Sequence, residues 1–176
     1  MHRYFTVLLG LLAGACAAPP MPAPAVPKPL PKPLPPASMP APGSALVDWQ
    51  DLPLTQGNWI YRPGAQGSTA FFGAPGQNAE LMLHCDRAAH RVILSRKGAA
   101  TESRSLVVRT SSMVRTLATQ PSGASPAYMT TALAPLDDVL DAMAFSRGRF
   151  VLEQAGLPNL VVPAWAEIGR VAEDCR

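Results

Sequence analysis

A proline-rich segment, residues 17–43, sets the strongest limit on how this chain can fold. It holds most of the 20 prolines of the chain, including the dense run from Pro27 to Pro36. Proline has no backbone N–H and fixes φ, so neither a helix nor a sheet is available to the segment. Polyproline II is the expected state, and at a rise of about 3.1 Å per residue the segment would extend on the order of 80 Å. Residues 44–176 are left to form a single globular domain.

The simplest role for this segment is a spacer between the domain and an attachment point. Two further roles stay open. One is a ligand for an aromatic-lined groove, and the other is a contact with anionic surfaces through Lys28 and Lys32.

The first 15 residues have the three-part pattern of a secretory signal peptide. A basic start is followed by an apolar run and then by small residues before Cys16. The apolar run is too short to span a bilayer, which takes about 20 residues. We therefore expect an exported protein on the periplasmic side of a membrane, with the outer membrane favoured.

The residues before Cys16, Leu-Ala-Gly-Ala, resemble the bacterial lipoprotein box. The resemblance implies that Cys16 carries a diacylglyceryl group, anchors the chain to a membrane, and begins a tether over residues 16–43. The alternative is ordinary signal-peptidase cleavage after Ala15 or Ala17, since both fit an A-x-A site.

Cysteine number favours one disulfide in the domain. If Cys16 is acylated, Cys85 and Cys175 are the two remaining cysteines, and their pairing leaves no unpaired thiol. Disulfides persist in exported domains. The alternative is two separate buried thiols.

The domain reads as α+β, an antiparallel sheet or sandwich of about six to eight short strands with two helices in its C-terminal third. Short apolar runs alternate with turn signals, and a polar loop is expected over 120–126. Strands are expected over 58–62, 69–72, 80–85, 90–95, 105–110, 113–117, 149–154 and 160–162, and helices over 137–143 and 164–173.

Four aromatic residues are expected to anchor this domain. Trp49 would pack a lead-in segment onto the core, and Trp165 would join a buried stripe on the last helix. Phe145 and Phe150 would hold both ends of a helix-to-strand turn in the core.

The net charge of +3 does not indicate nucleic-acid binding. Arg3, Lys28 and Lys32 lie outside the domain, and from Ser44 onward basic and acidic side chains are equal in number. The domain therefore lacks the positive field that attracts phosphate backbones.

The common catalytic signatures are absent from the sequence, so we expect no enzyme, no cofactor and no metal site. His84 and Cys85 are neighbours on a strand and point to opposite faces, which excludes a nucleophile–base pair. His84, Asp86 and His90 could meet at one end of a hairpin, but they are a poor ligand set.

An acidic group, Asp137, Asp138 and Asp141, opens the first expected helix. A calcium or acid–base site is one interpretation. The stronger one is a cap and dipole complement at a helix start.

Arg147 and Arg149 flank Gly148 between two phenylalanines and are the candidate partner-binding residues. The alternative is a structural turn in which Gly148 takes an awkward backbone conformation and the arginines pair with acids such as Glu173 and Asp174.

Four features follow one another along the chain. They are an aliphatic strand ending in Cys85, a middle hairpin, the segment 136–144 before a Phe/Arg-rich strand, and a last helix ending in Cys175. The order resembles uncharacterised envelope lipoproteins and is similar to invasion-associated locus B-like and type VI secretion-associated periplasmic domains. The resemblance implies a small β-rich envelope domain and supplies no catalytic residue.

The leading hypothesis is a non-enzymatic, membrane-anchored periplasmic binding or structural module with an envelope protein or cell-wall partner. One alternative is an inhibitor or accessory subunit of a periplasmic hydrolase that inserts the loop 120–126 into its partner. A small hydrolase is a third, which a pocket lined by acids or His84 would favour.

Overall fold

The computed structural model describes residues 48–176. Cys16, the signal pattern and the proline-rich segment lie outside the described residues. The described elements, in chain order, are η1 (Trp49–Asp51), β1 (Asn58–Arg62), β2 (Thr69–Gly73), β3 (Leu81–Asp86), β4 (Arg91–Lys97), β5 (Arg104–Arg109), β6 (Val114–Pro121), β7 (Tyr128–Leu133), α1 (Asp138–Ala144), β8 (Arg149–Gln154), β9 (Leu160–Pro163) and α2 (Ala166–Cys175).

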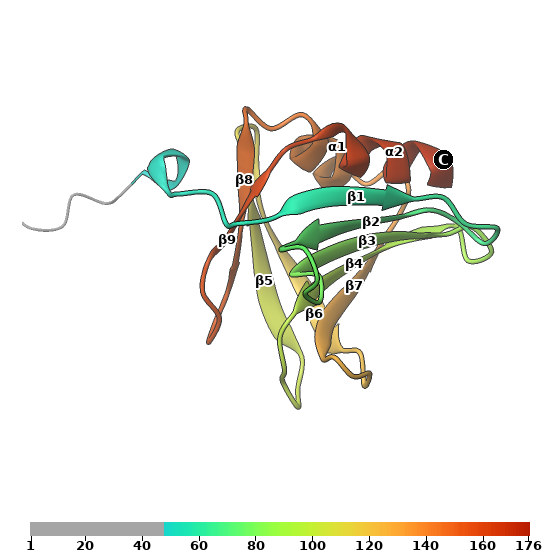
Figure 1. Ribbon diagram of the computed structural model, residues 1–176, viewed down its shortest axis with the longest axis horizontal. Coiled ribbons are helices and arrows are strands. Elements are labelled where there is room, and N and C mark those ends of the chain that lie inside the picture. The colour runs from blue at the N-terminus through green and yellow to red at the C-terminus, as the bar shows by residue number, and fades with distance from the viewer. Residues whose placement is uncertain (1–47) are drawn as a thin grey trace, which may run out of the picture. The chain divides into compact units, whose positions relative to one another are not determined.

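The strands form one antiparallel sheet in the order β1-β2-β3-β4-β7-β6-β5-β8-β9, which curls into a half-barrel (Figure 1). The curl brings the two ends of the sheet together. The Trp59 indole N–H of β1 donates to the Pro163 carbonyl of β9 at 2.9 Å, and the Thr55 N–H donates to the Val161 carbonyl at 2.9 Å. The expected α+β class is confirmed, with nine strands in place of six to eight.

Strand β7 is the strand that the sequence did not predict. It pairs with β4 over six residues and with β6 over Gln120 and Pro121, so it joins the two halves of the sheet. Tyr128, Met129 and Leu133 are buried, whereas the three residues between Met129 and Leu133 are partly or fully exposed. The run therefore lacks the alternation by which a half-buried strand is recognised.

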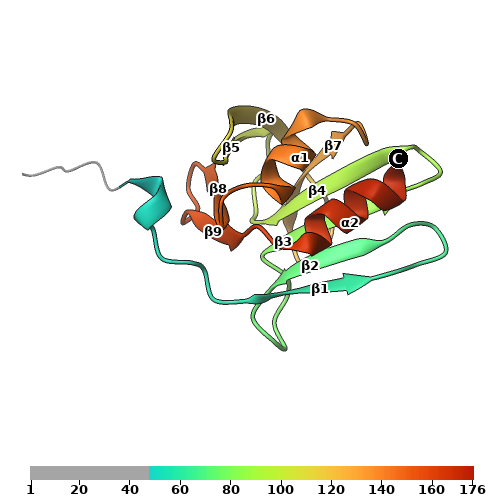
Figure 2. The same ribbon diagram turned by 90° about the horizontal axis from the view of Figure 1, so that it is seen from above.

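The core lies between the sheet and the two helices. Strand β3 alternates regularly, with Leu81, Leu83 and Cys85 fully buried and the residues between them half-exposed. Successive side chains of a strand point to opposite faces, so one face of β1–β4 is the core face. Helix α2 lies over this face and α1 lies beside α2, as the view from above shows (Figure 2).

Helix α2 packs through one stripe. Ile168, Val171 and Ala172 are buried at helical spacing, as expected. Trp165 is not part of the stripe: it is the N-cap residue and is 45% exposed, because the helix begins at Ala166, two residues later than predicted.

The end of α2 is bonded to the sheet through the predicted disulfide. Cys85 of β3 and Cys175 of α2 are paired, with their Cα atoms 5.4 Å apart. The bond closes a loop with a sequence separation of 90 residues. In the chain-entropy account such a loop stabilises by about 4–5 kcal/mol, and measured effects are often smaller.

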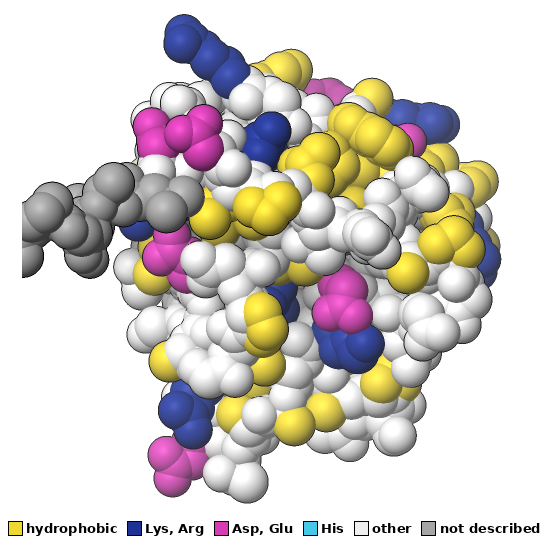
Figure 3. Space-filling model, turned by 60° about the vertical axis from the view of Figure 1, so that its left-hand side comes forward, with side chains coloured by type: hydrophobic (Ala, Val, Ile, Leu, Met, Phe, Trp, Pro, Cys, Tyr) yellow, Lys and Arg dark blue, Asp and Glu magenta, His cyan; other side chains and the backbone are white. Residues whose placement is uncertain are grey.

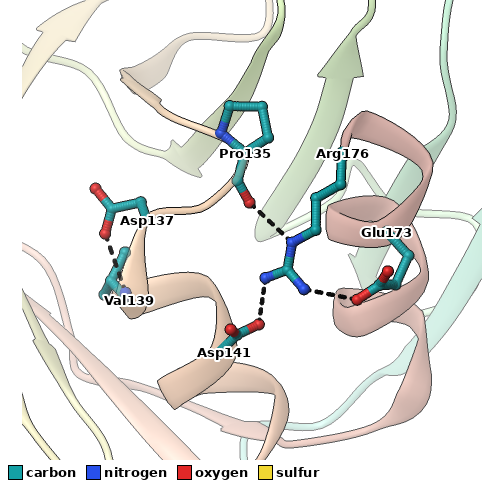
Figure 4. Close-up of polar contacts among 6 residues, drawn as sticks. All are labelled: Pro135, Asp137, Val139, Asp141, Glu173 and Arg176. Carbon is teal, nitrogen blue, oxygen red and sulfur yellow. Dashed lines mark hydrogen bonds and ion pairs between the residues drawn. The ribbon is translucent and has the colours of Figure 1, made fainter.

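Arg176 holds the two helices together (Figure 4). Its guanidinium pairs with Asp141 of α1 and with Glu173 of α2, and its Nε donates to the Pro135 carbonyl at 3.2 Å. Asp137 caps α1 by accepting the Val139 N–H at 3.0 Å. Asp137 therefore caps α1, and Asp141 pairs α1 with the end of α2. These are structural roles, as the stronger interpretation of the acidic group expects.

Trp49 does not anchor the lead-in segment in the core. It begins η1, in which no residue is buried, and the tryptophan of the core is Trp59, at 6% exposure. The lead-in is held instead by the Thr55–Val161 contact and by Arg149, whose guanidinium donates to the Leu52 carbonyl. Over residues 48–176, neither helix has the length and apolarity to cross a bilayer.

Replacing Cys85 and Cys175 together by alanine should lower the free energy of unfolding by about 2–4 kcal/mol, because the unfolded chain gains the entropy of an open loop. Urea denaturation measures the change. The matched control is the wild-type protein with reductant, which should lose a similar amount, whereas the double variant should not respond to reductant. Equal stability of the oxidised wild type and the double variant would contradict a stabilising disulfide.

Candidate functional site

The face of β1–β4 and β7 opposite α2 carries a continuous row of side chains. Cross-strand pairing aligns Ile60 with Phe71 and Phe71 with Met82. The row continues from Met82 to Ser95 and from Ser95 to Thr130. Five strands at a spacing of about 4.8 Å make this row about 19 Å long.

A groove of about 880 Å³ lies over this row. Typical ligand pockets have volumes of about 300–1,000 Å³. Its exposed lining is mostly apolar. The lining residues are Asn58, Ile60, Arg62, Phe71, Gly73, Ala74, Pro75, Gly76, Gln77, Asn78, Ala79, Met82, Ser95, Ser122, Ala124, Ser125, Pro126, Tyr128 and Thr130.

Two loops form the walls of the groove. The first, residues 74–79 between β2 and β3, is fixed by the Tyr128 hydroxyl, which donates to the Ala79 carbonyl at 2.8 Å. Burial raises the pKa of Tyr128, so the phenol keeps the proton that this bond needs. The second wall, residues 122–127, is fixed to β7 because the Ser122 N–H donates to the Tyr128 carbonyl at 2.8 Å. Tyr128 therefore holds both walls.

Arg62 is the charged side chain of the lining. Its guanidinium lies 5.4 Å from the centre of the Phe71 ring, within cation–π range. Among residues 48–176 it forms neither an ion pair nor a hydrogen bond. Lys97 and Glu80 pair with each other at 2.7 Å and lie outside the lining.

His84 lies on the same sheet face but outside the groove lining. Its Nδ1 is 2.8 Å from the Thr69 hydroxyl, whereas Asp86 pairs with Arg91 and caps the hairpin turn at Ala89. His90 belongs to that turn, with φ of 48°. Over the described part of the chain, no three His, Cys, Asp or Glu side chains gather as metal ligands.

The candidate partner-binding arginines lie in the turn between α1 and β8. Gly148 has φ of 76°, the left-handed conformation expected there. The Ser146 hydroxyl donates to the Arg149 carbonyl at 2.5 Å and accepts the Ser111 N–H at 3.0 Å. The Arg149 guanidinium donates to the Leu52 carbonyl, and the Arg147 side chain is exposed. Neither pairs with Glu173 or Asp174, because those acids are engaged by Arg176 and by the Tyr61 hydroxyl.

The two phenylalanines around this turn differ. Phe150 is fully buried as expected, whereas Phe145 is 80% exposed. Phe145 is the C-cap residue of α1, where the helix ends and its side chain leaves the buried face. Figure 3 shows hydrophobic side chains gathered over the helical end of the domain, with Lys or Arg side chains at the margins.

Two polar side chains are buried in the sheet away from the groove. Arg96, at 3% exposure, donates to the Pro158 carbonyl at 2.6 Å, and its Nε and Nη1 have no partner among the described residues. Burial lowers the pKa of Arg96. Gln154 donates to the Thr119 hydroxyl at 3.0 Å. These contacts join β4 to the segment after β8, and β8 to β6.

Sequence reasoning did not find the groove, although the sequence held a signal for it. An antiparallel sheet normally has one apolar and one solvated face. Here Ile60, Phe71, Met82 and Ile93 are apolar residues on the face opposite the core in four successive strands. Apolar residues on both faces of exposed strands indicate that the second face is covered or binds a ligand.

Comparison with protein-family models, with curated proteins and with solved structures finds no match to this chain. The groove must therefore be interpreted from its own geometry.

Replacing Tyr128 by phenylalanine should lower the free energy of unfolding by about 1–2 kcal/mol and speed amide exchange over residues 74–79, because the Ala79 carbonyl loses its donor. Hydrogen exchange measures the effect. The matched control is Tyr61→Phe, which removes a hydroxyl bound to Asp174 on the core face. Faster exchange in both variants alike would show that Tyr128 does not fix this loop specifically.

Proposed function

We propose that this chain is a non-enzymatic binding module of the cell envelope and that the groove over β1–β4 and β7 is its binding site. The observation that carries the proposal is an apolar-lined groove of about 880 Å³ on a sheet face that no helix of the described domain covers. A ligand that covers Ile60, Phe71 and Met82 gains about 25 cal/mol for each Å² of apolar surface removed from water.

The chemistry of the lining favours binding over catalysis. Its ionisable side chains are Arg62 and Tyr128, and the Tyr128 hydroxyl is already used at Ala79. A hydrolase needs a nucleophile or an activated water with a base in reach. Neither His84 nor a carboxylate lines the groove, so the observation that would favour a hydrolase is missing from this lining.

The inhibitor or accessory-subunit alternative places the function in the loop 120–126. In the structure Gln120 and Pro121 belong to β6 and pair with β7. Ser122, Ala124 and Pro126 line the groove. A loop that also forms a groove wall is more restricted than a free inhibitory loop, so the groove carries the stronger proposal.

Attachment to a membrane completes the proposed module. The lipoprotein-box resemblance before Cys16 supports an acylated anchor, and the proline-rich segment supports a tether of limited flexibility between anchor and domain. One acyl chain gives only marginal membrane binding, whereas a diacylglyceryl cysteine gives stable attachment. The module would then bind its ligand on the periplasmic side, close to a lipid surface.

Uptake of Nile red, an uncharged apolar dye, tests the groove. The wild-type protein should blue-shift its emission, and Thr130→Trp should weaken binding at least tenfold, because the indole fills the groove at the end of the row. The matched control is Ala132→Trp, two residues further on the same strand and face and outside the lining. Thermal unfolding checks that both variants fold. Absence of uptake, or equal loss in both variants, would refute groove binding.

Membrane anchoring is tested separately at Cys16. The mature protein should partition into detergent and carry acyl chains by mass spectrometry, and Cys16→Ser should remove both properties, since the thiol is the acylated atom. A soluble wild-type protein that begins after Ala15 or Ala17 without acylation would show ordinary signal-peptidase cleavage instead.

A further inference from the structure

Arg62 stands beside the apolar row of the groove, and its side chain has neither an ion-pair nor a hydrogen-bond partner among residues 48–176. It lies on β1 two residues from Ile60, so both side chains point to the same face. Ile60, Phe71 and Met82 then lead away from it across three strands. The groove therefore combines one positive charge with an adjoining apolar floor.

The other charged side chains of this sheet face are already neutralised or occupied. Lys97 pairs with Glu80 at 2.7 Å, and Arg91 pairs with Asp86 at 3.1 Å. No carboxylate is part of the lining to repel an anion from Arg62. By charge complementarity, an anionic group matches the lining better than a cationic one.

We propose that the groove binds an amphiphilic anion, with its acyl chain along Ile60, Phe71 and Met82 and its single negative head group at Arg62. This inference rests on the proposed groove binding and names its ligand class. A fatty-acid carboxylate and a lipid phosphate share this chemistry. Guanidinium groups bind both in a bidentate manner, while the Phe71 ring beneath holds the Arg62 side chain in place.

Shape also favours an acyl chain as the apolar body. The row is about 19 Å long at the usual strand spacing, and residues 74–79 and 122–127 border the groove at the end of the sheet where β2 ends and β3 and β7 begin. A narrow chain can lie along such a floor.

Displacement of Nile red by three probes of equal chain length tests the inference on the full mature protein. The probes are dodecanoate, methyl dodecyl phosphate, which is a phosphodiester with one negative charge, and the uncharged 1-dodecanol. At least one anion should bind about fivefold more tightly than the alcohol, the ratio given by an ion pair of about 1 kcal/mol at a partly exposed site. The tighter anion identifies the source, a free fatty acid or a phosphate-bearing lipid. Added salt should reduce the preference.

Arg62→Gln should abolish this preference and leave the affinity for 1-dodecanol within about twofold of wild type, and Arg62→Lys should restore part of it. The matched control is Arg104→Gln on β5, outside the groove lining. Equal affinities for anion and alcohol in the wild type, or a preference that survives Arg62→Gln, would overturn the inference.

Two further outcomes separate this inference from the proposed function. If all three probes bind equally and Thr130→Trp weakens them, groove binding stands and the anionic ligand class is wrong. If Nile red binds and none of the three probes displaces it, groove binding stands and the inference fails, whereas absence of Nile red binding would refute both. A gain of affinity for every probe when residues 17–43 are replaced by a Gly/Ser linker of equal length would identify the chain's own proline-rich segment as the occupant and overturn the inference.

Discussion

Helix α2 and the core face of β1–β4 depend on each other. The helix presents one apolar stripe, and the strands present Phe72, Leu83 and Cys85 toward it. The disulfide to Cys175 bonds the end of α2 to the same face, and Arg176 holds α1 against α2. Both helices therefore pack on the inner, core side of the curled sheet. The outer face of β1–β4 and β7 has no helix in the described domain to cover it.

The open face explains why the groove can be apolar without being core. Its floor follows from strand register, since Ile60, Phe71 and Met82 fall into one row only when β1, β2 and β3 pair as they do. Exposing apolar surface of this kind to water costs free energy. An apolar row beside one cation is therefore more consistent with a ligand-binding surface than with a bare one. The candidate arginines of the α1–β8 turn have a different role, because Arg149 fixes the lead-in segment at Leu52.

Prediction from the sequence succeeded where local chemistry decides the outcome. Short apolar runs bounded by turn residues indicated eight strands, the acid at Asp137 marked a helix start, and the number of cysteines indicated the pairing of Cys85 with Cys175. It failed where tertiary contacts override the pattern. The buried residues of β7 do not alternate with exposed ones, and Phe145 is exposed because α1 ends at that residue. Trp165 is exposed because α2 begins two residues later than predicted, and Trp49 begins η1, in which no residue is buried.

The sequence by itself determined the α+β class of the domain, because short apolar runs between turn residues indicate strands and apolar residues at three-to-four spacing indicate helices. It also determined which residues of β3 face the core. Only the tertiary structure decided that Ile60, Phe71, Met82, Ser95 and Thr130 form one row, that two loops wall it, and that Arg62 stands at its edge. Strand order and register are set by contacts between residues far apart in the chain. Local propensity carries no information about such contacts.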